Sequence, residues 1–156
     1  MVLPDPILVS ACLLGLQTRY DNACKGHHGV LDWLHRHRKI PVPVCPEQLA
    51  GLPTPRSRTF FCGGDGEAVL DAKAQVVSDE GENRSAIFLH GARETLKVAR
   101  LSGCRQALLK ERSPSCGVHQ VYCAEKIIAG RGVATALLRR NGLEVFSEED
   151  LSGMNS

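Results

Sequence analysis

The chain has 156 residues, a length that favours a single domain, which we place over residues 1–156. Hydrophobic residues make up 43% of it and charged residues 23%, which is typical of a globular protein and excludes a disordered chain. A formal net charge of +2 excludes the strongly basic character of a DNA-binding protein, so we expect no DNA partner.

The first part of the chain predicts two strands separated by a helix. Residues 7–10 are a short apolar run typical of a buried strand. Apolar residues recur at helical spacing over residues 30–39, and a proline beyond them indicates where that helix ends. Residues 41–45 are β-branched and interrupted by proline, which predicts a strand at the edge of a sheet. Residues 46–66 contain many helix and strand breakers and predict a long irregular loop with a functional role.

The middle of the chain predicts a small insertion and a long helix. Residues 68–70 and 75–77 are short apolar runs that we expect to pair as a small hairpin. Asn83 or Ser85 can cap the helix that follows, and Gly103 is well placed to end it.

The last part of the chain returns to alternating strands and helices. Strands are predicted at residues 106–110 and 143–146, with a helix at 133–140 between them and a helix-start pattern at 147–150. This alternation predicts a single three-layer α/β domain with a mostly parallel sheet, Rossmann- or flavodoxin-like, carrying a small hairpin insertion.

The cysteines do not form the pattern of a disulfide framework. There are seven of them, an odd number, and no two have C-x-x-C spacing. The first residues lack a basic segment followed by a long apolar run, so we expect neither a signal peptide nor a membrane span. We therefore expect a cytoplasmic protein in which the thiols stay reduced. The sequence gives no indication of an oligomeric state.

Three of the cysteines share one setting. Cys12, Cys45 and Cys116 each lie in a loop just after a predicted strand. Ligands of open parallel sheets bind outside the carboxyl ends of the strands, so we expect these three side chains to converge there. The remaining cysteines lack this setting, and we expect structural or incidental roles for them: Cys24, Cys62, Cys104 and Cys123.

Three convergent thiols are compatible with several chemistries. They can bind zinc, provide one activated nucleophile with two bystanders, or hold an iron–sulfur cluster in which one iron has no protein ligand. Zinc sites normally take ligands in local pairs, which this chain lacks.

Long motifs surround all three cysteines. They are residues 10–15 (Ser-Ala-Cys-Leu-Leu-Gly) with 19–21, residues 44–49 (Val-Cys-Pro-Glu-Gln-Leu) with 51–56, and residues 109–117 (Leu-Lys-Glu-Arg-Ser-Pro-Ser-Cys-Gly). These segments resemble the three signatures of a bacterial family that includes the thiouracil desulfidases, and residues 130–138 and 142–150 also follow its pattern. The chain departs from that pattern in three places. Residues 57–61 (Ser-Arg-Thr-Phe-Phe) stand where Pro-Pro-Ala-Glu is common, residues 123–126 (Cys-Ala-Glu-Lys) where Asp-Gly-Thr-Phe is common, and residues 83–85 (Asn-Arg-Ser) where Asp-Val-Thr is usual. These differences concern the substrate more than the cluster.

The resemblance implies a cofactor and a reaction. The cofactor is an oxygen-sensitive [4Fe-4S] cluster bound by Cys12, Cys45 and Cys116, which an aerobic purification can remove. Its unique iron binds the sulfur of a thiolated pyrimidine-like small molecule, and the sulfur leaves as sulfide without net redox change.

Such a reaction needs a group that moves a proton. Glu47 lies two residues after Cys45, and we expect it to be the general acid/base. Ser113 and Ser115 flank a proline beside Cys116. By resemblance Ser113 is the catalytic hydroxyl that bonds the substrate or the departing sulfur, and we expect Ser115 to contact the substrate.

Basic residues in the same motifs are candidates for substrate binding. We expect Arg19 and Lys110, together with Arg56, to orient an anionic or carbonyl-bearing substrate. Two other functions fit the same residues. A structural or sensing metal module would bind its metal with all positions filled and would not depend on Glu47, whereas a sulfurtransferase would use a single cysteine of low pKa and no metal.

Overall fold

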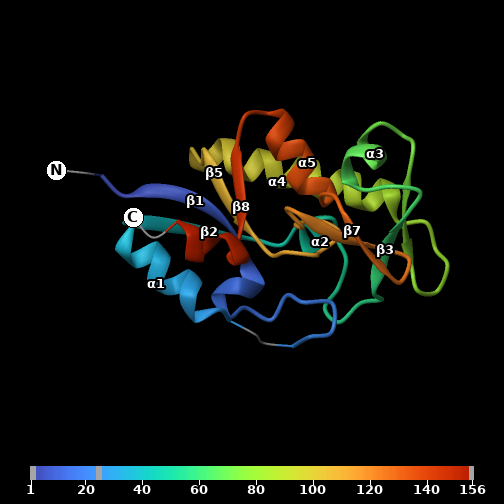
Figure 1. Cartoon of the computed structure of the whole chain (residues 1–156), viewed down its shortest axis with the longest axis horizontal. Coiled ribbons are helices and arrows are strands. Elements are labelled where there is room, and N and C mark those ends of the chain that lie inside the picture. The colour runs from blue at the N-terminus through green and yellow to red at the C-terminus, as the bar shows by residue number, and fades with distance from the viewer. Residues whose placement is uncertain (1–2, 24–25, 155–156) are drawn as a thin grey trace.

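The computed structural model describes residues 3–23 and 26–154 and contains two four-stranded sheets with helices around them (Figure 1). The first, sheet A, is entirely parallel, in the order β2-β1-β5-β8. Its strands overlap all four strands predicted for a parallel sheet, with ends that differ by one or two residues. They are β1 (Asp5–Ser10), β2 (Lys39–Val44), β5 (Gln106–Leu109) and β8 (Glu144–Ser147).

The edge position of β2 follows from its two prolines. Pro41 and Pro43 lie opposite Ile7 and Val9 of β1. A proline has no N–H to donate, so a strand with two of them cannot hydrogen-bond fully to a neighbour on each side. The prediction of an edge strand is confirmed.

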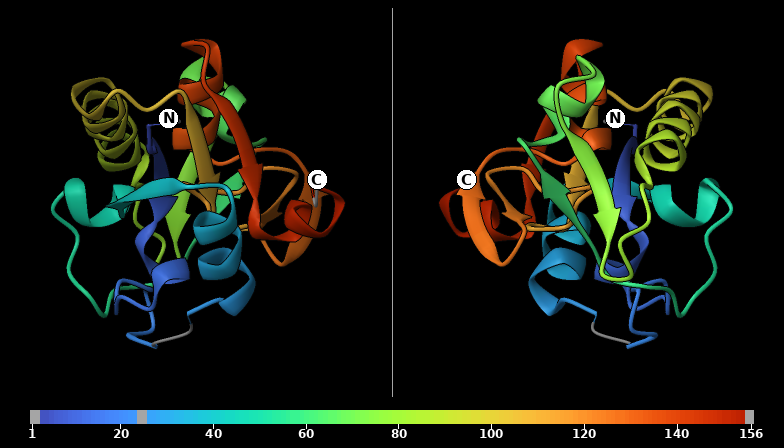
Figure 2. Two further views of the ribbon diagram at one scale, coloured as in Figure 1. Left: turned by 90° about the vertical axis from the view of Figure 1, so that its left-hand side faces the viewer. Right: turned by 90° about the vertical axis from the view of Figure 1, so that its right-hand side faces the viewer.

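Helices cover both faces of sheet A, as the side views in Figure 2 show. Side chains of a strand alternate between the two faces, so Leu8 packs in one core and its neighbours Ile7 and Val9 in the other. The Leu8 core includes residues of α4 (Ser85–Ser102) and α5 (Val133–Arg140). The opposite core includes residues of α1 (His28–Arg36) and of the 3₁₀ helix η2 (Glu148–Gly153). The prediction of three layers is confirmed.

The long helix α4 joins the two sheets. Its C-terminal end is the one expected from the sequence, but the N-cap residue is Arg84, whose side chain makes no capping hydrogen bond, so the predicted cap by Asn83 or Ser85 is wrong. The amide N–H of Ser85 donates to Asn83 Oδ1 at 2.9 Å, and Gly103 follows the last turn with φ = 72°, a left-handed conformation that glycine adopts without strain. Phe88, near its start, packs in the core of the second sheet, whereas Leu96, near its end, packs in the core of sheet A.

The second sheet, sheet B, replaces the predicted hairpin insertion, which is wrong. Residues Gly66–Leu70 form the helix α3, because the carboxylate of Asp65 accepts the N–H of Ala68 (3.3 Å) and caps the first turn. The segment Gln75–Ser78 is a strand, β4, but it pairs antiparallel with β3 (Thr59–Cys62).

Parts of the predicted loop at residues 46–66 are regular. It contains the short helix α2 (Pro46–Leu49) and strand β3. The sequence analysis also missed the antiparallel pair β6 (Gln120–Cys123) and β7 (Lys126–Ala129), which completes sheet B in the order β4-β3-β6-β7. Each of these strands has only four residues, too few for a clear alternation of polar and apolar side chains.

Within the described part of the chain, no helix is long and apolar enough to span a bilayer.

Candidate metal centre and active site

A cavity of about 290 Å³ opens at the carboxyl ends of β1, β2 and β5, and all three candidate cysteines line it. Cys12 lies in the 3₁₀ helix η1 (Ala11–Leu14), which follows β1 directly. Cys45 is the residue between β2 and α2, and Cys116 lies in the loop after β5. Parallel strands end at one edge of a sheet, so residues far apart in the sequence meet there.

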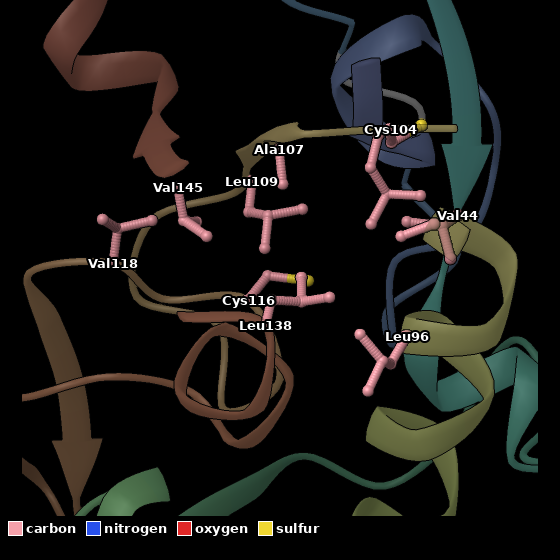
Figure 3. Close-up of a cluster of buried hydrophobic side chains, with 11 residues drawn as sticks. Val44, Leu96, Cys104, Ala107, Leu109, Cys116, Val118, Leu138 and Val145 are labelled. Carbon is pink, nitrogen blue, oxygen red and sulfur yellow. The ribbon is translucent and has the colours of Figure 1, made fainter. Parts of the chain in front are cut away.

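The three thiols are partly or fully shielded from water, because Cys12 and Cys45 are half-buried and Cys116 is buried. Cys116 is 4% exposed and packs with Val44, Leu96 and Leu138 in the core of sheet A (Figure 3). Burial raises the pKa of all three thiols, that of Cys12 to about 11, and the charge on a neighbouring Cys45 thiolate would raise those of Cys12 and Cys116 further. The three thiols therefore lie close enough for the charge on one to influence the ionisation of another.

The donor set suits a cluster better than a single ion. Within residues 3–23 and 26–154, no three His, Cys, Asp or Glu side chains are grouped closely enough to hold one metal ion. An iron–sulfur cluster needs no such convergence, because each thiolate binds a different iron. Three thiols around one cavity, one buried and two half-buried, therefore fit a cluster that takes three protein ligands.

Glu47 lies beside the thiols, held from two sides. It is in the first turn of α2 and lines the cavity, with a side chain that is only 11% exposed. Its Oε1 accepts a hydrogen bond from Arg56 Nε (3.1 Å), and its Oε2 accepts one from Ser115 Oγ (3.3 Å). Both carboxylate oxygens therefore have a fixed direction relative to the cavity.

Arg56 connects Glu47 to a candidate ligand. Its side chain is 6% exposed, and Nη2 donates to the Thr18 carbonyl at 2.8 Å and lies 3.7 Å from Cys45 Sγ. Nη1 donates to the Pro53 carbonyl at 3.1 Å. The guanidinium thus fixes the loop after β1, the thiol of Cys45 and the carboxylate of Glu47 relative to one another. Arg56 therefore holds these groups in place, and its positive charge is already paired with the carboxylate of Glu47.

A sequence model of the 2-thiouracil desulfurase family matches residues 7–150, nearly the whole chain. The chain belongs to this family. It is 38% identical over 151 residues to the uncharacterized protein YbbK of Bacillus subtilis (strain 168), covering 94% of this chain and 97% of YbbK. Among solved structures it is similar to the [4Fe-4S]-dependent thiouracil desulfidase TudS, at 42% identity and a TM-score of 0.79, covering 96% of this chain and 94% of the TudS chain. The resemblance identified from the three motifs is confirmed.

The two serines of the third family motif occupy different places. Ser113 lines the cavity, and its Oγ accepts the amide N–H groups of Ser115 (3.2 Å) and Cys116 (3.1 Å). The hydroxyl proton is not used in these two bonds and can be donated into the cavity. Ser115 is 2% exposed and is not among the residues that line the cavity. Its hydroxyl contacts Glu47, so it orients that carboxylate in place of the substrate contact expected from the sequence.

The two predicted substrate-binding cations line the cavity, and each is paired with an acid. Arg19 Nε lies 3.2 Å from Asp21 Oδ1, and this hydrogen bond, with that of the Ala23 amide, lowers the pKa of Asp21 to about 2. Lys110 Nζ lies 2.9 Å from Glu148 Oε2. Asp21 and Glu148 therefore largely balance the positive charges of Arg19 and Lys110.

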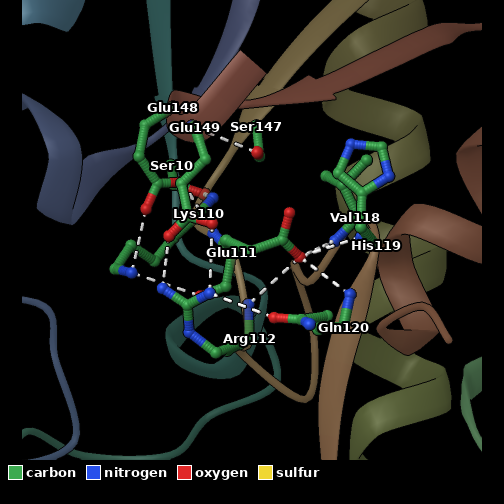
Figure 4. Close-up of polar contacts among 10 residues, drawn as sticks. All are labelled: Ser10, Lys110, Glu111, Arg112, Val118, His119, Gln120, Ser147, Glu148 and Glu149. Atoms are coloured by element: carbon green, nitrogen blue, oxygen red, sulfur yellow. Dashed lines mark hydrogen bonds and ion pairs between the residues drawn. The ribbon is translucent and has the colours of Figure 1, made fainter. Parts of the chain in front are cut away.

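Glu111, which the sequence analysis did not single out, organises the loop of the third motif. It is 2% exposed, and its Oε1 accepts the amide N–H groups of Val118 and His119 at 2.8 Å and of Gln120 at 3.1 Å (Figure 4). Burial by itself would raise the pKa of this carboxyl, but the amide donors outweigh burial and lower it. Residues 112–120, which carry Ser113 and Cys116, are thus folded around one buried carboxylate.

Sheet B and the residue just before β3 also contribute lining residues that were not predicted from the sequence: Arg58, Thr59 and Tyr122. Residues 57–61 depart from the family motif, and this departure was the feature of the sequence that could have pointed to Arg58. No such signal marked Tyr122, since β6 itself was not predicted. The described cysteines outside the three motifs do not line the cavity: Cys62, Cys104 and Cys123. Cys24 lies outside the described residues.

Proposed function

We propose that this protein removes sulfur from a thiolated pyrimidine-like small molecule. In the overall reaction, a thiocarbonyl and water give a carbonyl and hydrogen sulfide, so no electrons are gained or lost. The observation that carries the proposal is the meeting of three thiols, one buried and two half-buried, and the carboxylate of Glu47 at one cavity. The family match and the printed name of TudS support the choice of substrate class.

The cofactor of this proposal is a [4Fe-4S] cluster. Cys12, Cys45 and Cys116 would hold it, one thiolate to each of three irons. When bound, such a cluster supplies a Lewis-acidic iron without a protein ligand, where the sulfur of the substrate can bind.

Glu47 is the proton carrier of this proposal. Its carboxylate, with Arg56 as counter-charge, takes a proton from the water that attacks the thiocarbonyl carbon and later gives it to the departing sulfur. Ser115 fixes the direction of the oxygen that does not face Arg56.

The other polar groups orient the substrate. Ser113 donates its hydroxyl proton to the substrate or to the departing sulfur. Arg19 and Lys110 present N–H donors at the cavity wall for carbonyl oxygens of the ring.

A sulfurtransferase is not favoured by the environment of the thiols. A nucleophilic cysteine needs a lowered pKa, whereas burial raises the pKa of each of the three cysteines that line the cavity.

The experiment that tests the proposal is an anaerobic desulfuration assay. The protein is reconstituted with iron and sulfide, desalted, and incubated with 2-thiouracil or 4-thiouracil, and uracil and released sulfide are quantified. We expect the two products in equal amounts, and none with protein that has no iron. A protein with a full complement of iron that releases no sulfide from either compound would contradict the proposal in favour of a structural or sensing cluster.

A further inference from the structure

Two helices outside the cavity hold the two segments that supply Glu47 and two of the three thiols. Helix α4 packs against both α2 and α5. Helix α2 directly follows Cys45 and carries Glu47, whereas α5 is hydrogen-bonded to the loop that carries Cys116. No residue of α4 or α5 lines the cavity. The position of one segment relative to the other therefore depends on how these helices pack.

The start of α5 holds the Cys116 loop through its backbone. The amide N–H of Ala134 donates to the carbonyl of Ser115 at 2.9 Å, and the hydroxyl of Thr135 donates to the carbonyl of Cys116 at 2.9 Å. Gly132, just before the helix, allows this close approach, because a Cβ atom there would lie 2.3 Å from the carbonyl carbon of Ser115. The loop is thus fixed to α5.

At Gly91, the backbone of α4 comes into direct contact with the backbone of α2. A Cβ atom on Gly91 would lie 2.3 Å from the carbonyl oxygen of Pro46 and 3.2 Å from Cβ of Ala50. Since Cβ atoms in proteins essentially never lie within 3.0 Å of another such atom, a side chain at this position would push the two backbones apart by more than half an ångström. Pro46 lies between Cys45 and Glu47, so this displacement would move a candidate ligand and the proton carrier together.

From this geometry we infer that Gly91 is a positioning residue of the site, because it lets α2 pack against α4 at the separation that aligns Glu47 with Ser115. The inference rests on the proposed function for the role of Glu47. The distance from Ser115 Oγ to Glu47 Oε2 is 3.3 Å, already long for a hydrogen bond between two oxygens, so a displacement of α2 by half an ångström is enough to break it. Ser115 does not follow such a movement, because its loop is fixed to α5.

Gly91→Ala tests the inference first in the protein before reconstitution, where neither cluster nor turnover is needed. The thiols are labelled with iodoacetamide, and the rate for each cysteine is measured by mass spectrometry of its peptide. We expect Cys45 to react about fivefold faster than in the wild type, the change expected when a typical destabilising substitution eases local opening. The other two cavity thiols should be unchanged. Buried Cys104 reports that the fold is intact, and exposed Cys62 gives the rate of an unshielded thiol.

A double-mutant cycle with Ser115→Ala then tests the position of Glu47 in the reconstituted protein. We expect Gly91→Ala to lower kcat by roughly ten- to a hundredfold, the effect of losing the Ser115–Glu47 hydrogen bond. In the Gly91→Ala protein, Ser115→Ala should lower kcat further by less than about twofold, because the bond is already absent. Effects of the two substitutions that simply multiply would overturn the inference.

Two variants control for packing and folding. Gly153→Ala adds a methyl group at an exposed glycine whose Cβ would meet nothing within 4 Å, so it should change neither the labelling nor kcat. Alanine is favoured over glycine inside a helix, so a loss of stability in Gly91→Ala reports the contact with Pro46 and not helix propensity. If rapid labelling of Cys104 shows that this variant does not fold, Ala50→Val enlarges the same contact from the half-buried end of α2 and should produce the same two effects.

The outcomes separate this inference from the proposed function. If the wild type releases no sulfide but Gly91→Ala still exposes Cys45 selectively, the proposed reaction fails while the placement of α2 by Gly91 is supported. Unchanged labelling of Cys45 and unchanged kcat in both Gly91→Ala and Ala50→Val would overturn the inference and leave the reaction in place.

Discussion

Ser115 donates a hydrogen bond to Glu47 across 68 positions of sequence, with 3.3 Å between Oγ and Oε2. The bond joins the loop after β5 to the first turn of α2, so the candidate proton carrier is oriented by the same loop that carries Cys116. The hydrogen bond thus connects the buried hydroxyl of Ser115, which does not line the cavity, to the carboxylate proposed to carry the proton.

Ser115→Ala tests this orienting role. Removing the hydroxyl leaves Glu47 attached to Arg56 alone, and a hydrogen bond to a charged group is worth about 1.5–3 kcal/mol, so we expect kcat to fall by roughly ten- to a hundredfold. Sulfide release is measured after matched reconstitution, with iron counted per chain. Ser115→Thr keeps the hydroxyl and should recover most of the rate if the alanine effect arises from Glu47. An equal loss in the two variants would instead indicate that packing is responsible.

Glu47→Gln tests the proton carrier itself. The glutamine keeps the size and much of the hydrogen bonding of Glu47 but cannot exchange protons at neutral pH. We expect sulfide release to fall by about 10²–10⁴-fold, the usual contribution of a general acid or base, while iron content stays unchanged. Turnover like that of the wild type, with full iron, would remove Glu47 from the mechanism. Loss of iron in the variant would show that Glu47 serves the metal centre.

Ser113→Ala removes a hydroxyl that faces the cavity. We expect a loss of roughly ten- to a hundredfold in kcat, because a hydrogen bond to a developing charge is worth about 1.5–3 kcal/mol. The variant also loses the acceptor for the amides of Ser115 and Cys116, so its melting temperature is measured alongside turnover. Ser102→Ala, at the end of α4 and outside the cavity, is the control. A fall in stability with normal kcat would assign Ser113 to the turn alone.

Single replacements of Cys12, Cys45 and Cys116 by alanine test the ligand set. Each should abolish the broad visible absorbance expected after anaerobic reconstitution with iron and sulfide, because each removes one bond from protein to cluster. Cys62→Ala and Cys123→Ala, which lie outside the cavity, should leave the spectrum unchanged, and we expect the same of Cys24→Ala. A chromophore that survives Cys45→Ala but is lost with Cys123→Ala would contradict the assignment.

Glu111→Gln tests the carboxylate that organises the loop of residues 112–120. The folded-state pKa is lowered, so the stabilising effect is fully present above the unfolded-state value of about 4.5 and is lost as the pH falls through the folded-state value. We expect the variant to be less stable by about 1.5–3 kcal/mol at pH 7, and the difference to shrink as the pH falls below about 4.5. Thermal unfolding at a series of pH values measures it. Glu125→Gln, at an exposed position in the turn between β6 and β7, is the control, and a pH-independent difference would exclude this role of the charge.

Much of this protein was determined by local sequence. The strands β1, β5 and β8 of sheet A were predictable because they are short apolar runs that are mostly buried. The edge strand β2 is largely exposed and was predictable from its β-branched residues and prolines. Gly103 marked the end of α4 because only a residue without a side chain tolerates its backbone angle well. The three cysteines could be placed at one edge, since the carboxyl ends of parallel strands share an edge by topology.

The tertiary structure decided what no local pattern contains. Sheet B joins strands of four residues from distant parts of the chain, and their stability comes from pairing partners and from helix α4, which a window of sequence cannot show. For the same reason, the Ser115–Glu47 hydrogen bond and the stacking of Arg58 on Tyr122 could not be predicted from the sequence. Side-chain contacts depend on three-dimensional distances of a few ångströms, which only the packing of the folded chain determines.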